Sequence, residues 1–526
     1  MSPPKNAPSK PRRDRDAAQR RSGGRSARIK RRAASAVAAP VALVRRTPPY
    51  DLLDEESLDA LERQADWILH RIGVEIRDAE SLALLRRAGA SVDGSRARFE
   101  PGLARALCAT APRQFTMHAR RSQGVARSIV IGGAHVVFVP AYGPPFVRDL
   151  DRGRRYATID DFRNFVRLTH ATPWLQHSGG TVCEPVDIAV NKRHLDMVFA
   201  HLRYSAKPFM GAVTAPQRAQ DSIDMARIVF GDDFMRTHCV IQGNINVNSP
   251  LVFDHTMLGA LKVYARANQG VVLSPFILGG AMGPVTQAAL VAQAHAETLV
   301  GVALTQLVCA GAPVVYGNFL TTIDLQTGAP TFGTPGANLA TFAIGQLCRR
   351  LGLPLRCGGH LTASKVADGQ AMQESADTMT AGLLAGANFV LQSAGWLEGG
   401  LTIGYEKFMI DIDRCAMMHR ALAGLEIDDN ALAQDAYQEA GPGGNFLATA
   451  HTMANFETAN HRSDLADNRS FEHWQEDGAT TIEQRAHASW KNALAEYEMP
   501  PMDAGVEEEL VEFVERKKGA VEDEWY

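Results

Sequence analysis

The sequence predicts an α/β fold in which eight parallel strands close into a (β/α)8 TIM barrel. From about residue 170 onward, short apolar segments alternate with helical stretches, and their centres recur at a spacing of roughly 33–41 residues. Seven such units are legible. Buried strands that alternate with helices imply a parallel sheet with right-handed crossovers. An open doubly wound sheet is the rival, but the glycine-rich nucleotide turn that usually follows its first strand does not occur in this sequence.

The barrel strands are expected where apolar runs end in small or polar residues. We expect them at residues 174–183, 208–213, 239–247, 270–277, 313–319, 354–358 and 388–393, with the eighth near 136–142 or 156–159. Helical spacing of apolar residues predicts helices at 192–203, 217–230, 251–268, 285–309, 338–351, 370–384 and 406–422. Gly270, Gly352 and Gly386 follow three of these helices, as glycine commonly does at a helix end.

Composition shifts divide the rest of the chain. Residues 1–46 hold 14 Lys and Arg against 2 Asp, and their Pro, Ser, Ala and Arg content predicts a disordered basic tail. Residues 47–155 read as an N-terminal extension with helices at 57–69, 81–88 and 101–111, and with a hairpin of strands at 128–131 and 135–140 around Gly132-Gly133. The barrel is expected over residues 156–425, followed by a C-terminal helical appendage at 426–526.

Charge and cysteine usage restrict the partners. The chain has 526 residues and a net charge of −3, but residues beyond 46 alone carry −15, which gives no support to nucleic-acid binding by the fold. No uninterrupted apolar run approaches the ~20 residues that cross a bilayer, so we expect no membrane partner. Seven scattered cysteines without a CxxC pair are typical of reduced thiols and indicate a cytoplasmic protein.

In a barrel, the active site lies at the carboxyl ends of the strands. Asn244 and Asn246 lie two residues apart in an apolar strand, which places both on one face and predicts a polar pocket wall, with loop hydrogen bonding as the alternative. His177, Cys183, Cys357 and His360 follow strands, but none has a paired metal-ligand spacing, so we expect no metal site. No GxSxG elbow for a serine nucleophile occurs.

Several segments resemble the trimethylamine methyltransferase superfamily. They are Gly279-Gly280-Ala281-Met282-Gly283-Pro284-Val285-Thr286 with Gln293 and Glu297; Gly311-Ala312-Pro313 with Tyr316-Gly317; Thr362-Ala363-Ser364-Lys365 with Asp368, Gln370 and Glu374; and Gly441-Pro442-Gly443-Gly444 with Phe446-Leu447 and His451-Thr452. The resemblance covers about residues 50–520. It implies a TIM barrel that demethylates a methylated amine and passes the methyl group to Co(I) of a separate corrinoid protein, so that this chain binds no cofactor itself.

Founding members of that superfamily use pyrrolysine inside the barrel, whereas this sequence holds only the twenty standard residues. This departure puts trimethylamine in doubt and makes the chain similar to the non-pyrrolysine branch, whose members act on quaternary amines such as glycine betaine. A quaternary ammonium is already cationic and leaves as a neutral amine. The protein then has to hold the cation, for which aromatic faces contribute about 0.5–2 kcal/mol each, and to aim one methyl group at cobalt.

The candidate site residues follow from this interpretation. The aromatic cage is expected from Phe276, Tyr316, Phe319 and Trp396, and the polar substrate contacts from Asn244, Asn246, Asn318, Lys365 and Glu398. We assign His360, Glu184 and Asp324 to the catalytic group, with the acids complementing the cation and with His360 or Lys365 available for a substrate carboxylate. Two other functions remain open: a barrel lyase or isomerase with changed chemistry, and a non-catalytic methylamine-binding subunit. Barrels of this size often self-associate, so we also expect a homo-oligomer.

Overall fold

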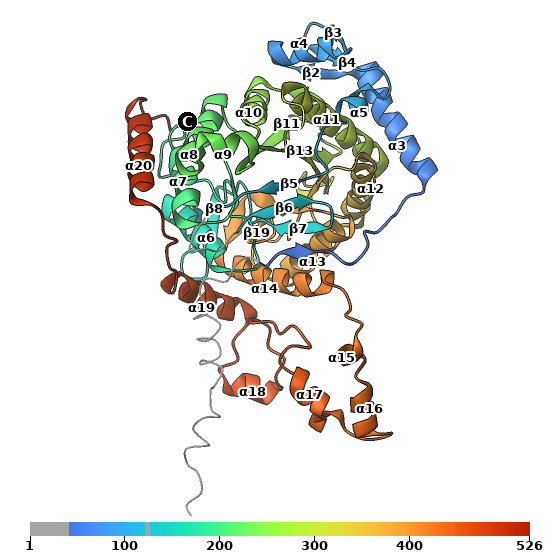
Figure 1. Ribbon diagram of the computed structural model, residues 1–526, viewed down its shortest axis with the longest axis vertical. Helices are drawn as coiled ribbons and strands as arrows, with labels where there is room; N and C mark the ends of the chain where they lie inside the picture. The colour runs from blue at the N-terminus through green and yellow to red at the C-terminus, as the bar shows by residue number, and fades with distance from the viewer. Residues whose placement is uncertain (1–40, 121–126, 526) are drawn as a thin grey trace, which may run out of the picture. The chain divides into compact units, whose positions relative to one another are not determined.

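A closed ring of parallel strands forms the centre of the computed structural model, which describes residues 41–120 and 127–525 (Figure 1). Seven strands run parallel in one ladder. In spatial order they are β10 (Phe209–Met210), β11 (Ile241–Val247), β13 (Gly270–Gly279), β14 (Val314–Gly317), β17 (Leu355–Gly358), β18 (Phe389–Leu391) and β7 (His135–Phe138). Each of these strands is rich in buried apolar residues, as is typical of a parallel sheet that is covered on both faces.

The segment around His177 closes the ring between β7 and β10. The Gln176 amide donates to Phe138 O at 3.2 Å on one side, while the Ser178 amide donates to Pro208 O at 2.7 Å on the other. This is the strand expected at 174–183, although its pairing is too irregular to form a regular strand. Within the described residues, eight strand positions therefore complete the (β/α)8 barrel.

The barrel begins earlier than the expected boundary at residue 156. β7 lies in the segment that we assigned to the N-terminal extension, yet it pairs in parallel with β18 and supplies the first barrel strand. Gly132-Gly133 does turn the chain between β6 (Ile129–Gly132) and β7, so the hairpin prediction is confirmed. The hairpin partner of β6 is also a barrel strand, because Val136, Val137 and Phe138 are all buried.

Eight helices of the described chain follow the eight strand positions around the ring. They are α6 (Ile159–Ala171), α7 (Arg193–Tyr204), α8 (Pro216–Phe230), α10 (His255–Arg266), α11 (Gln287–Val308), α12 (Pro335–Leu351), α13 (Gly369–Leu384) and α14 (Tyr405–Leu422). Three of these helices begin with a side-chain cap: Thr158 forms a capping box with Asp161 at α6, and the side chains of Asp254 and Asp368 accept from the first turns of α10 and α13.

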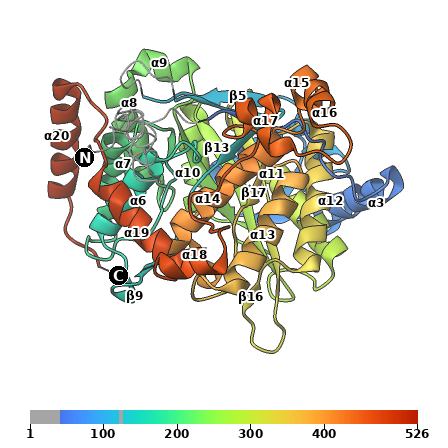
Figure 2. The same ribbon diagram turned by 90° about the horizontal axis from the view of Figure 1, so that it is seen from below.

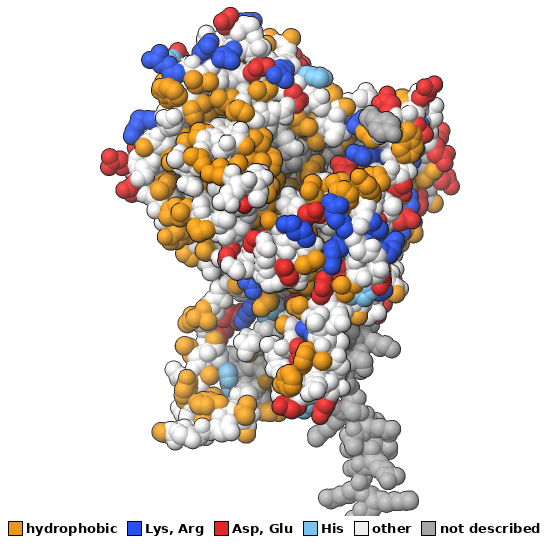
Figure 3. All heavy atoms as spheres, turned by 180° about the vertical axis from the view of Figure 1, so that it is seen from behind, with side chains coloured by type: hydrophobic (Ala, Val, Ile, Leu, Met, Phe, Trp, Pro, Cys, Tyr) orange, Lys and Arg blue, Asp and Glu red, His pale blue; other side chains and the backbone are white. Residues whose placement is uncertain are grey.

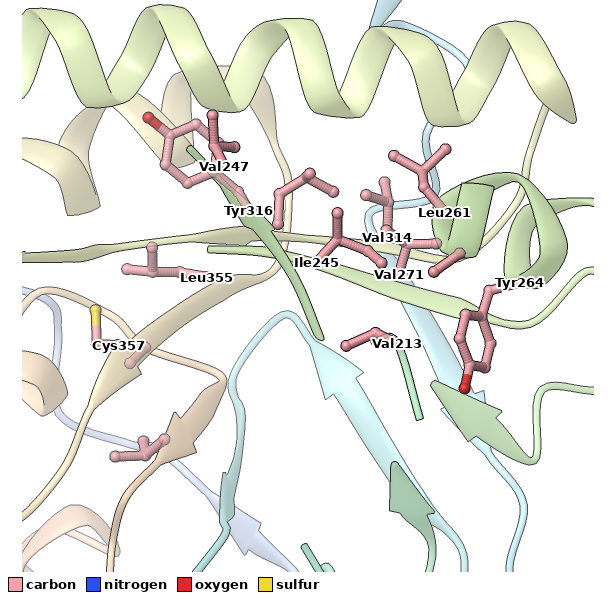
Figure 4. Close-up of a cluster of buried hydrophobic side chains, with 14 of the residues drawn as sticks. Val213, Ile245, Val247, Leu261, Tyr264, Val271, Val314, Tyr316, Leu355 and Cys357 are labelled. Carbon is pink, nitrogen blue, oxygen red and sulfur yellow. The ribbon is translucent and has the colours of Figure 1, made fainter. Parts of the chain in front are cut away.

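Two layers of apolar side chains lie on the two faces of the ring. The outer layer packs the strands against the helices, and Figure 4 shows part of it with Ile245, Val314, Tyr316 and Leu355. The inner layer fills the amino-terminal half of the barrel with Val137, Val139, Met210, Val272, Val315, Phe389 and Leu391. α11 is long and apolar enough to cross a membrane by length and composition, but nearly all of its side chains are buried inside this protein, as in a core helix.

The two ends of the barrel differ. β5 (Gln114–Met117) and β6 form a hairpin whose Met117, Ile129 and Ile131 join the inner apolar layer and close the amino-terminal end. β15 (Phe319–Ile323) and β16 (Pro330–Thr331) form a second hairpin beyond the carboxyl ends of the strands. Figure 2 shows β5 and β16 at opposite ends of the barrel. The closed amino-terminal end leaves the carboxyl end as the entrance.

The flanking segments wrap around this barrel. The N-terminal segment contains α3 (Glu55–Trp67), α4 (Ala79–Arg87) and α5 (Leu103–Leu107), as expected, and packs on α11. It also contains strands that the sequence did not predict, because β2 (Val74–Ile76), β3 (Ser91–Asp93) and β4 (Arg96–Arg98) are only three residues long. They form a small sheet with β12 (Val252–Phe253), which occupies the start of the helix expected at 251–268.

The carboxyl-terminal segment is helical, as expected. After the short helices α15 (Asp429–Leu432), α16 (Gln434–Ala440), α17 (Ala450–Asn455) and α18 (Phe471–Glu476), it returns to the barrel. There α19 (Ile482–Ala495) packs on α14, and α20 (Ala504–Gly519) packs on α8. A third sheet joins β8 (Phe146–Asp149), β9 (Gly153–Tyr156), β19 (Trp396–Leu397) and β20 (Thr402–Gly404).

The basic tail is shorter than predicted. Residues 1–40 lie outside the described residues, but β1 (Leu43–Val44) pairs antiparallel with β7, and the Arg45 side chain is buried against Ala387 O. The last residues of the predicted tail are thus part of the barrel wall. All seven cysteines of the chain are unpaired thiols, six of them buried.

Candidate functional site

Aromatic side chains meet at the carboxyl end of the barrel. Phe276 on β13 and Phe319 on β15 lie with ring centroids 5.0 Å apart, and both rings are partly exposed. The Trp396 ring stands edge-on to Phe319 at 6.0 Å and to Phe332 at 6.2 Å. Three of the four predicted cage residues therefore come together, and Phe332, which follows the short strand β16, joins them without having been predicted. Such a group of faces suits a cation.

Arg356 points into the same region from β17. In the sheet, Arg356 lies opposite Gly317 of β14 and Phe389 of β18, and it is 1% exposed. One guanidinium nitrogen donates to Asn318 O at 2.7 Å, and the other donates to Gln392 Oε1 at 2.8 Å. The guanidinium carbon lies 4.8 Å from the centre of the Phe319 ring. Burial lowers the pKa of Arg356 to about 10, so the group stays charged at neutral pH.

His360 follows β17 and is a buried, neutral acceptor. Its Nδ1 lies 2.7 Å from Ser393 O, and because a carbonyl only accepts, Nδ1 carries the proton. Nε2 is buried without a partner in the described residues. Burial and the nearby Lys407 ammonium lower the pKa of His360 to about 3. Lys407 is itself neutralised by Asp411 at 2.5 Å, so the cation next to His360 is already paired.

Other buried polar atoms in the described part of the barrel also lack a hydrogen-bond partner. Within the described residues, those without a hydrogen bond include His177 Nε2, both amide atoms of Gln242, and Trp396 Nε1. Buried polar groups are satisfied in most folded proteins, so an orphaned group such as Trp396 Nε1, on a ring of the aromatic group, indicates a ligand or ordered water there. Asn244 and Asn246 share a strand face as predicted, since Asn244 Nδ2 donates to Asn246 Oδ1 at 3.3 Å, and Ser274 Oγ donates to Asn244 Oδ1 at 2.8 Å.

The structure separates two predicted pocket residues from this region. Tyr316 faces outward from β14, where its hydroxyl lies 2.9 Å from His295 Nδ1 under α11, so its assignment to the cage is wrong (Figure 4). Alternation along the strand explains this, because Val315 and Gly317 take the inward positions. Asn318 also turns its side chain outward, donating to Thr341 Oγ1 at 3.2 Å, and only its carbonyl reaches the barrel interior.

The predicted carboxylates are engaged elsewhere. Asp324 lies exposed in the turn of the β15–β16 hairpin, and its Oδ1 accepts from the Gln326 amide at 2.8 Å, so its catalytic assignment is wrong. Glu184 pairs with Arg193, and burial raises the pKa of Glu184. Glu398 accepts from Arg154 at 2.8 Å and from Thr402 at 2.6 Å. Although burial alone would raise the pKa of Glu398, these two donors lower it.

The remaining prediction, Lys365, lies exposed on the loop after β17, outside the aromatic group. Sequence reasoning missed Arg356 as well as Phe332. A signal for Arg356 was present, since a charged residue inside the apolar strand of residues 354–358 is costly unless it has a partner.

The residues that carry the family resemblance hold the loops rather than line the cage. Glu297 is buried in α11 and accepts from Ser249 Oγ at 2.6 Å and from the Leu251 amide at 2.9 Å, while Gln293 bridges it to Met282 O. Glu374 in α13 likewise accepts from Thr362 and from the Ala363 amide. These contacts brace the loops after β11, β13 and β17, whose shape sets the entrance.

Comparison with known proteins decides the family. A family profile described as trimethylamine methyltransferase (MTTB) matches residues 21–522, nearly the whole chain. The chain belongs to the trimethylamine methyltransferase family. The glycine betaine methyltransferase of Desulfitobacterium hafniense is 36% identical over 478 residues, which cover 91% of this chain and 99% of that protein. The proline betaine:corrinoid methyltransferase of Eubacterium limosum is 30% identical over 415 residues, covering 76% and 82%.

Among solved structures, one that the chain matches is that of the monomethylamine methyltransferase of Methanosarcina barkeri, with a TM-score of 0.49 and 9% identity over 85% of this chain and 89% of that one. In residues 41–120 and 127–525 of this family member, no group of three or more His, Cys, Asp or Glu side chains is placed to bind a metal ion.

Proposed function

We propose that this member of the trimethylamine methyltransferase family moves a methyl group from a quaternary methylated amine such as glycine betaine to Co(I) of a separate corrinoid protein. The observation that carries the proposal is the group of Phe276, Phe319 and Trp396 rings at the only barrel end that the β5–β6 hairpin leaves open. The names of the two betaine methyltransferases described above support the substrate class.

The chain's own residues contribute binding and alignment. The aromatic faces hold the cation, and their apolar bodies exclude water, which strengthens the attraction in a region of low polarity. Holding the ammonium against these rings leaves one methyl group directed toward the entrance, and such positioning lowers barriers by up to about 7–11 kcal/mol. His360 Nε2, an acceptor that stays neutral, interacts favourably with the positive N-methyl groups without titrating at physiological pH. The corrinoid partner supplies the cobalt nucleophile.

The face around the entrance has the character of a docking surface for that partner. Val285 after β13, Leu325 in the β15–β16 turn and Leu401 before β20 are 54%, 71% and 49% exposed. Figure 3 shows the face opposite β5, with apolar side chains gathered over part of it. Exposed apolar groups of this kind mark interaction sites on soluble proteins. A corrinoid protein seated here would bring its cofactor to the open end of the barrel.

The proposal is tested with the purified chain, Co(I) cobalamin or a corrinoid protein, and a panel of amines. We expect glycine betaine to give methylcobalamin and dimethylglycine, and trimethylamine to give neither. Failure of every quaternary amine would overturn the proposal. Turnover of an amine without cobalamin would favour a lyase or isomerase, and tight binding with no demethylated product would favour a binding subunit.

We further propose that the chain self-associates through an arm formed by residues 425–456. Its exposed apolar side chains are Leu425, Ile427, Leu432, Tyr437, Phe446, Leu447, Met453 and Phe456. The helices of this arm are too short to bury these side chains among themselves. Figure 2 shows α15, α16 and α17 towards the end of the barrel at which β5 lies, away from β16 and the entrance, which favours a second copy over the corrinoid protein. Sedimentation of the wild type and of Leu447→Asp tests this, and an unchanged mass would refute it.

A further inference from the structure

Arg356 is a buried cation without a buried anion. The buried Lys407 has a carboxylate partner, Asp411, at 2.5 Å, and the buried Lys207 donates all three of its hydrogen bonds to backbone carbonyls, of Thr169, Thr172 and Leu175. Arg356 forms no ion pair with any described residue, and the two atoms that accept its hydrogen bonds, Asn318 O and Gln392 Oε1, are neutral. Its Nε is buried with no partner. An unpaired charge in the interior is expensive, so its presence calls for an anion that the chain itself does not supply.

The surroundings orient the guanidinium instead of neutralising it. Gln392 adopts a left-handed backbone conformation, with φ of 57°, that non-glycine residues rarely occupy, and its side chain is the one that accepts from Arg356. The Phe319 ring lies 4.8 Å from the guanidinium carbon. Two guanidinium nitrogens of Arg356 are held in place by neutral acceptors, and an aromatic ring lies beside them. The remaining N–H donors of this planar group can therefore bind a carboxylate.

We infer that Arg356 binds the carboxylate of the substrate and so selects zwitterionic quaternary amines that carry the carboxylate a short distance from the ammonium. The inference rests on the proposed function and narrows its substrate class. Phe319 lies between the two halves of the site: it contacts Arg356 on one side and the Phe276 and Trp396 rings on the others. A compact zwitterion spans these neighbouring positions, with its cation on the rings and its anion on the guanidinium.

The same arrangement disfavours amines without a carboxylate. A simple cation such as tetramethylammonium or choline meets the aromatic rings next to an uncompensated guanidinium, and like charges repel strongly where water is excluded. The two residues that the sequence suggested for a carboxylate do not compete for this role. His360 is neutral because burial lowers its pKa to about 3, and Lys365 is exposed outside the group of aromatic side chains.

Direct binding tests the inference without any methyl transfer. Calorimetric titration of the purified chain with glycine betaine, choline and tetramethylammonium compares the wild type with Arg356→Gln. We expect the wild type to bind glycine betaine at least about 100-fold more tightly than choline, and Arg356→Gln to lose on the order of 100-fold in betaine affinity while choline binding stays equal or improves. Arg45→Gln is the matched control, since it also removes a buried guanidinium, one that lies against Ala387 O outside the barrel interior.

Gln392→Glu is the second variant, which keeps the inference testable if Arg356→Gln does not fold. It gives Arg356 a carboxylate of the chain's own at the position of the present acceptor, so we expect betaine affinity to fall and choline affinity to rise. Betaine binding that survives Arg356→Gln or Gln392→Glu unchanged would overturn the inference and leave the proposed function standing. A wild type that demethylates choline but not glycine betaine would also overturn the role of Arg356. A wild type that demethylates no quaternary amine would overturn the proposed function itself.

Discussion

The aromatic cage leads to a prediction that separates cation binding from apolar contact. Phe276 is the clearest position to change, because its ring is partly exposed at the entrance and touches Phe319 at 5.0 Å, whereas the Phe319 ring also faces Arg356. Phe276→Leu removes the π face and keeps an apolar side chain. A ring that faces a desolvated cation contributes about 0.5–2 kcal/mol, which corresponds to roughly 2- to 30-fold in Kd.

The assay compares glycine betaine with 3,3-dimethylbutanoate, a neutral-headed compound of the same shape with the same carboxylate. Both ligands contact apolar surface, but only glycine betaine carries the positive charge that the ring quadrupole attracts. In Phe276→Leu, measured by calorimetry, we expect the betaine Kd to rise about 2- to 30-fold and that of 3,3-dimethylbutanoate to stay unchanged within about 2-fold.

Phe234→Leu is the matched control, because Phe234 is 37% exposed on α9 (Asp232–Thr237), where its ring stacks on His238. Its replacement leaves both affinities unchanged. Equal weakening of the two ligands in Phe276→Leu would show that the ring offers only apolar contact, and no weakening would remove Phe276 from the site. Either result refutes the reasoning that the rings recognise charge.

Two further predictions concern groups away from the rings. Tyr316→Phe leaves the betaine Kd unchanged, because Tyr316 faces away from the site. It lowers the free energy of unfolding, measured by urea titration, by about 1–3 kcal/mol, because His295 Nδ1 loses its buried hydrogen-bond partner. A changed betaine Kd would contradict the outward position of Tyr316. Lowering the pH from 7.5 to 5.5 lowers the free energy of unfolding. The reason is that histidines of the unfolded chain take up protons near pH 6.5, whereas histidines buried in the folded chain do not. Each buried histidine then lowers the free energy of unfolding by about 1.4 kcal/mol at pH 5.5, and four of them lower it by about 5 kcal/mol. Burial lowers the pKa to about 4 for His201 and His419 and to about 3 for His295 and His360. The pKa of Asp411, which burial raises to about 6, offsets about 1 kcal/mol of this loss. Urea titrations with equal free energies at the two pH values would contradict this account.

Much of the barrel was predictable because periodicity is a local property. The helices expected at 192–203, 217–230 and 406–422 lie within one residue of α7, α8 and α14 at each end. β7 shows the limit of that reasoning: its hairpin turn with β6 was legible, but its second partner, β18, lies about 250 residues away in the chain. Pairing between strands so far apart in the sequence cannot be predicted from the local spacing of apolar residues.

By itself, the amino-acid sequence determined the class of fold, the order of its strand–helix units and the family. The reason is that the spacing of apolar residues and the short motifs involve only residues that are close together in the sequence. It also named three of the rings that meet at the entrance. Only the tertiary structure decided which side chains face inward. One residue of shift along a strand moves a side chain from one face to the other, so Tyr316 lies under α11, whereas Arg356, on the neighbouring strand, points into the barrel. The charge balance around Arg356 depends on β14, β17 and the end of β18 together, and it exists only once the ring has closed.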